Sequence, residues 1–187
     1  MLGLIKDLIY ISKRFEKKRE YWELFFLILS SSLIISLAAL SSIKSLSHIS
    51  VGIAVSTFLI IFVGSYFFAY LILIGFNALK ENGNYMKALN AVGLSLSLFA
   101  AGYLISVLLM MIPAQSFWAL LISTIAAMVF VTALFSAFVL LIKLCSILFK
   151  SDIITSKIIL MVILTTLYIL ANLVMSMTIV KLYLMML

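Results

Sequence analysis

The sequence predicts an all-α integral membrane protein, a bundle of five transmembrane helices preceded by an amphipathic helix at the membrane surface. The first observation is composition: 66% of the 187 residues are hydrophobic and 10% are charged, against roughly 45–50% and about 25% in soluble domains. The second is that the charges separate uncharged runs long enough to cross a hydrocarbon core about 30 Å thick. The third is that the basic residues gather on alternate connecting segments. This composition excludes an ordinary soluble domain and a disordered chain.

The first element is the basic segment 1–22, in which Leu4, Leu8, Ile11 and Phe15 recur at helical spacing. Most of the basic residues lie off this stripe, so we expect a helix in the membrane interface with its cations near anionic headgroups. Anchoring and orienting the first span is the favoured interpretation, and docking a cytosolic partner is the alternative. The candidate lipid or partner contacts here are Lys13, Arg14, Lys17, Lys18 and Arg19.

The transmembrane helices follow from the uncharged runs. The 55 uncharged residues between Lys87 and Lys143 would form a single helix of about 82 Å, which is too long for a bilayer. Pro113, the only proline, divides this run because proline breaks a helix. Ser45–Ser50 is expected to be a loop, which places His48 outside the membrane. The transmembrane domain, residues 23–187, is therefore expected to contain spans at about 24–43, 51–79, 88–112, 116–142 and 158–180.

The basic residues predict the orientation. With the N-terminus in the cytoplasm, five spans place eleven of the 13 lysines and arginines on cytoplasmic segments and two, Lys44 and Lys181, outside. Cytoplasmic segments carry such an excess, and an odd number of spans puts the C-terminus outside. Cleavage of the first span as a signal peptide is disfavoured, because its apolar run exceeds the usual length of about 7–15 residues.

Polar residues within the expected spans are uncharged. Absence of an ionisable residue there argues against a proton-relay transporter, which keeps such groups at membrane depth. Small residues four apart let helix backbones approach closely, and Asn or Ser side chains can bond between helices. The candidate helix-packing residues are Gly93, Ser97, Ala101, Asn172 and Ser176.

The inventory of reactive side chains argues against an enzyme. His48 and Cys145 are the single histidine and the single cysteine, whereas a zinc site needs three or four ligands. An intramembrane serine protease needs a base beside its serine, and glycine-rich phosphate loops are absent. We therefore expect no catalytic residue, metal or cofactor. Nucleic-acid binding is not expected either, because the basic cluster has a membrane explanation.

The stretch from Leu79 to Ile105 carries a family resemblance. Its polar turn and the start of the following helix match a pattern of Gly, a small polar residue and an aromatic residue, then Lys or Gln, then Ala-Leu. Within the span that follows, the pattern has a Gly-Tyr-Ser-Leu-like element. This resembles the Yip family, Rab-GTPase-interacting membrane proteins with many prokaryotic relatives. Leu94 stands where tyrosine is usual, and an acidic Asp-Leu-Tyr-Gly-Pro element of eukaryotic members is missing, which implies the prokaryotic branch. The matching positions are Gly83, Asn84, Tyr85, Lys87, Ala88, Leu89, Gly93, Leu94, Ser95 and Leu96.

The resemblance implies a non-enzymatic protein of a prokaryotic cell membrane, acting by association with lipids or protein partners. Its expected working surfaces are the basic segment 1–22 and the inner loop with Lys80 and Lys87. Membrane lipids are the expected partners. Two further classes of partner stay open: a membrane or cytosolic protein, and a second copy of the chain. The alternative function is a small transporter or channel, as a single chain or an oligomer, with a path lined by Ser, Thr and Asn.

Overall fold

The computed structural model describes residues 21–41, 48–78, 84–112 and 117–148, together with Val162, Thr165 and Thr166. Four helices make up the four ranges, and each is long and apolar enough to cross a membrane. This confirms the all-α class for the described part of the chain and is compatible with a membrane protein. Residues 1–20 of the expected interfacial segment and all but three residues of the expected fifth span lie outside the described residues. The last two residues of that segment, Tyr21 and Trp22, belong to the first described helix instead. The helices are α2 (Tyr21–Ser41), α3 (His48–Ala78), α4 (Tyr85–Met110) and α5 (Phe117–Leu148).

The helix ends differ from the expected bounds by one to six residues, and two of these differences have a clear physical reason. α3 begins at His48, so the expectation of a loop through Ser50 is wrong for its last three residues. Serine lowers helix stability by only a few tenths of a kcal/mol, so the Ser50 position does not prevent helix formation. α5 continues to Leu148, beyond the expected end at residue 142. Lys143 does not end this helix, because lysine is a good helix former and its long stem lets the ammonium reach polar surroundings.

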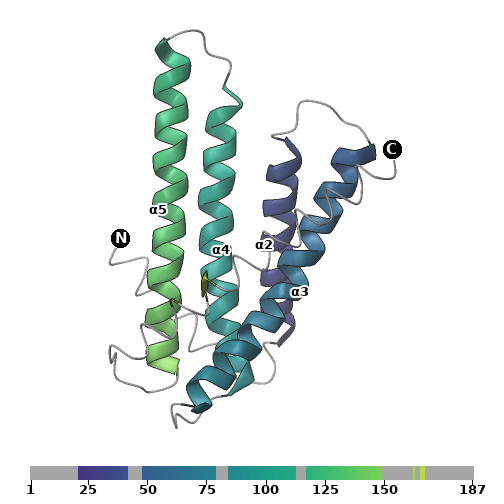
Figure 1. Cartoon of the computed structure of the whole chain (residues 1–187), viewed down its shortest axis with the longest axis vertical. Coiled ribbons are helices and arrows are strands. Elements are labelled where there is room, and N and C mark those ends of the chain that lie inside the picture. Colours follow the sequence, from purple (N-terminus) through teal and green to yellow (C-terminus); the bar gives the residue numbers. More distant parts are fainter. Residues whose placement is uncertain are drawn as a thin grey trace.

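The four described helices alternate in direction, and α4 is the central one (Figure 1). α4 packs against α2, α3 and α5, and α2 also packs against α3. In Figure 1, α4 and α5 run side by side while α3 crosses obliquely. As a result, the starts of α2 and α4 and the ends of α3 and α5 gather at one end of the bundle, which we call the inner end.

The densest core lies toward the inner end. Leu24, Phe76, Leu89 and Leu144 come from four different helices, belong to one apolar cluster and are at most 2% exposed. The outward faces carry large apolar side chains as well, and Phe135 is 67% exposed. Exposed apolar surface on this scale is unfavourable in water but is the expected surface of helices in lipid.

Candidate functional surfaces

The described residues at the start of the stretch from Leu79 to Ile105, from Asn84 onward, form the beginning of α4. Asn84 is the N-cap of α4, with extended backbone angles (φ −125°, ψ 134°), and its Oδ1 accepts a hydrogen bond from the Met86 N–H at 3.0 Å. The Tyr85 hydroxyl donates to the carbonyl oxygen of Tyr66, on α3, at 3.2 Å. Ala88 is fully buried in the core. These side chains begin α4 and attach it to α3.

The basic surface is described only in part. Lys87 lies in the first turn of α4, partly exposed, at the inner end. Lys143 lies in the last part of α5, toward the same end. The other basic candidates, Lys13, Arg14, Lys17, Lys18, Arg19 and Lys80, lie outside the described residues.

The candidate packing residues on α4 have different surroundings. Gly93 is buried against α2: a Cβ atom added to it would lie 2.8 Å from Leu24 Cδ1 and 3.2 Å from Ile28 Cγ1. Ser97 is half-buried, and its hydroxyl donates to a carbonyl of its own helix at 2.9 Å. Ala101 is exposed. Asn172 and Ser176 lie outside the described residues.

The contact between α4 and α5 depends on residues that were not singled out from the sequence. A Cβ added to Gly102 would overlap the Cβ of Ala133 on α5, so glycine permits this close approach. One turn further, the buried Ser106 hydroxyl donates to the carbonyl oxygen of Ala126 at 2.9 Å, which links the two helices. Gly102 and Ser106 are themselves small residues four apart, a signal that was available in the sequence.

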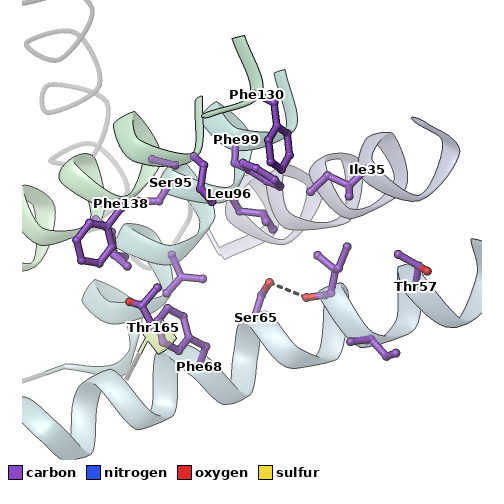
Figure 2. A pocket seen from close by; sticks show the side chains of 16 residues that line it. Ile35, Thr57, Ser65, Phe68, Ser95, Leu96, Phe99, Phe130, Phe138 and Thr165 are labelled. Carbon is purple, nitrogen blue, oxygen red and sulfur yellow. Dashed lines mark hydrogen bonds between the residues drawn. The ribbon is translucent and has the colours of Figure 1, made fainter. Parts of the chain in front are cut away.

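A groove of about 620 Å³ opens between the four described helices (Figure 2). We call it the interhelical groove. Its lining includes the rings of Phe68 on α3, Phe99 on α4, and Phe130 and Phe138 on α5, and it also includes Thr165. The surface of the groove is predominantly apolar. In this respect the groove resembles the ligand pockets that lie between the helices of bundles, which are lined mainly by apolar side chains.

The hydroxyl groups of the described helices that line this groove donate to their own helices. Thr57 bonds to a carbonyl one turn earlier at 2.8 Å, and Ser95 does so at 2.7 Å. Ser65 donates to the carbonyl oxygen of Ile61 at 2.6 Å (Figure 2). Such bonds satisfy a hydroxyl within a helix. These hydroxyls therefore do not offer their protons to a polar solute in the groove.

Within the described ranges, reactive side chains do not converge on a site. No three His, Cys, Asp or Glu residues of these ranges lie close enough together to hold a metal ion. Cys145 is a fully buried free thiol in the apolar core, and His48 is the first residue of α3.

Comparison with known proteins gives no relative. No protein-family model matches the chain, and neither the curated proteins nor the solved structures contain a match.

Proposed function

We propose that this chain is a non-enzymatic, five-span membrane protein of the Yip type that acts by association with lipids or with membrane or cytosolic proteins. The observation that carries the proposal is a succession of four membrane-length helices with Lys87 and Lys143 near one end of the bundle. Lysines near span ends mark the cytoplasmic side. The inner end of the bundle is then the cytoplasmic face. Lys80 belongs to the connection between α3 and α4 in the sequence, so the proposal places it on this face as well.

The finer parts of the proposal extend this arrangement to the whole chain. Residues 1–20 form the interfacial helix that precedes α2, and residues 158–180 form the fifth span. The N-terminus is then cytoplasmic and the C-terminus outside, in the cell membrane of a prokaryote. The cytoplasmic face combines the basic segment 1–22 with the inner loop, and this positive surface attracts anionic lipids or an acidic partner.

Replacing the five basic residues of the first segment tests this role in the full-length protein. Glutamine replaces Lys13, Arg14, Lys17, Lys18 and Arg19 together. After extraction from membranes, the anionic phospholipid that co-purifies should fall at least about fivefold, since each surface cation contributes about 1 kcal/mol. A control variant carries Lys44→Gln and Lys181→Gln, which alter the opposite face. Unchanged lipid retention together with unchanged orientation of reporter tags would remove the proposed role.

Flux measurements separate this proposal from the transporter or channel alternative. A path for ions or polar solutes needs side chains that can replace water, whereas the groove hydroxyls of the described helices bond to their own backbones. We therefore expect liposomes containing the protein to pass ions and small solutes no faster than protein-free liposomes. Specific flux above that background would favour the alternative.

A further inference from the structure

α3 is longer than the hydrocarbon core of a bilayer is thick. Its 31 residues extend about 46 Å at 1.5 Å per residue, against a core of about 30 Å. A helix with this excess length tilts or bends in the membrane, and α3 crosses the other described helices obliquely (Figure 1). The packing and the sequence of α3 indicate the point at which it bends most readily.

The two halves of α3 are packed to different degrees. In the inner half, four apolar side chains between Phe68 and Phe76 are at most 4% exposed, and all four belong to the apolar core cluster. In the outer half, from Val51 to Val63, Ala54 and Ile60 are the two buried residues, and neither belongs to that cluster. Few buried apolar contacts are typical of segments that move easily. The outer half of α3 is therefore the less firmly held part.

The boundary between these halves has the sequence of a helix hinge. Gly64 has no side chain to pack, and a glycine within a helix costs about 1 kcal/mol relative to alanine. The next residue, Ser65, donates its hydroxyl to the carbonyl oxygen of Ile61 (Figure 2). A serine that bonds one turn back in this way often bends its helix, and Gly/Ser pairs are recurrent sites of helix kinks.

The parts of the bundle around this boundary are tied together. Directly after the Gly/Ser pair, the carbonyl oxygen of Tyr66 accepts the hydrogen bond from Tyr85, which attaches α3 to α4. On the opposite wall of the groove, α4 and α5 are joined by the close contact at Gly102 and by the hydrogen bond from Ser106 to Ala126. None of these contacts holds the outer half of α3.

We propose that α3 bends at Gly64–Ser65 and that its outer arm, residues 48–63, opens and closes the interhelical groove. Thr57, Ile60 and Ile61 of this arm line the groove. A change of about 20° in the bend moves Thr57, about 10 Å from the hinge, by about 4 Å, and moves the start of α3 by about 8 Å. Such a movement admits an apolar group from the membrane or excludes it. The inference rests on the membrane-spanning part of the proposed function and goes beyond it.

Distances between spin labels test the hinge in the full-length protein in lipid bilayers, with Cys145→Ala removing the native thiol. The outer pair, Val51→Cys with Leu120→Cys, joins the arm to the outer end of α5. The inner pair, Ile74→Cys with Val139→Cys, joins the same two helices on the inner side of the hinge. All four labelled positions are exposed. Because the arm moves by several ångströms, the distance distribution should be at least about twice as wide for the outer pair as for the inner pair.

Substitutions at the hinge should narrow the outer distribution. Gly64→Ala should bring it toward the width of the inner pair, because alanine makes the helix stiffer. The matched control is Gly75→Ala, which changes another half-buried glycine of α3 on the inner side of the hinge and should leave the outer distribution unchanged. Ser65→Ala removes the bond to Ile61 and should also narrow it, which keeps the test independent of Gly64→Ala.

A third pair separates a hinge from fraying at the start of α3. Val51→Cys and Val63→Cys both lie in the arm at exposed positions, so a rigid arm keeps their distance distribution as narrow as that of the inner pair. A broad distribution would mean that the arm unwinds and would overturn the inference. An outer distribution as narrow as the inner one, or equal effects of Gly64→Ala and Gly75→Ala, would also overturn it. Resistance of the reconstituted protein to alkaline extraction shows separately whether it spans the bilayer.

Discussion

Replacing Gly102 by alanine tests the packing of α4 on α5 most directly. The added methyl group would overlap the Cβ of Ala133, a side chain that has no rotamer to change, so the helices have to move apart. Overpacking of this kind costs about 1–3 kcal/mol, while alanine in place of a helical glycine returns about 0.5–1 kcal/mol. We expect a net loss of about 1–2 kcal/mol in the free energy of unfolding.

Gly93 provides the comparison. There the closest atom to an added Cβ is Leu24 Cδ1, at 2.8 Å. This atom is the end of a flexible side chain, which can move more easily than the Cβ of an alanine. The overpacking cost therefore falls at the low end of its range, and the helix-propensity gain offsets most of it. Gly93→Ala should stay within about 1 kcal/mol of the unaltered protein.

A double-mutant cycle in mixed micelles measures both effects. The full-length chain is unfolded by increasing the fraction of SDS, and helix content is followed by circular dichroism. Ala133→Gly should restore most of the stability lost in Gly102→Ala, because it removes the opposing methyl group. Ala127→Gly, at an exposed position on α5, measures the propensity cost of glycine alone. Full stability of Gly102→Ala, or failure of Ala133→Gly to rescue it, would refute the close contact.

Three smaller losses should be measurable by the same unfolding titration. Asn84→Ala removes the cap of α4 and should cost about 1 kcal/mol; no loss would mean that the cap is dispensable. Tyr85→Phe removes the hydrogen bond to α3 and should cost about 0.5–1.5 kcal/mol, and equal stability would show that this bond contributes nothing. Ser106→Ala removes the hydrogen bond to Ala126 on α5 and should cost about 0.6 kcal/mol. Ser97→Ala, whose hydroxyl bonds within its own helix, is the matched control, and an equal loss there would contradict the interhelical role.

Composition and charge were sufficient to predict the all-α class and the four membrane-length helices of the described part of the chain. The break around Pro113 lies between the end of α4 and the start of α5, because proline cannot continue a helix. The exact ends could not be predicted, since a charge marks the limit of the hydrocarbon and does not end a helix. Lys143 illustrates the difference: α5 continues five residues beyond it.

The contacts between helices were predictable only as a type. Small residues four apart indicate close packing, but the pattern does not say which helix lies opposite. Gly93 meets α2, whereas Ala101, in the same stripe, is exposed. The interhelical groove was not predictable at all, because its lining comes from residues far apart in the chain that no shared spacing connects.

The positions of the two glycines explain why α4 is the central helix. Gly93 and Gly102 are nine residues apart, which at 100° per residue is half a turn beyond two full turns, so they lie on opposite faces of α4. One face meets α2 and the other meets α5, while Tyr85 binds α4 to α3. Asn84 and Tyr85 therefore begin this central helix and attach it to α3. Because these two side chains bond within the protein, partner binding is better sought among the basic residues of the inner end, Lys87 included.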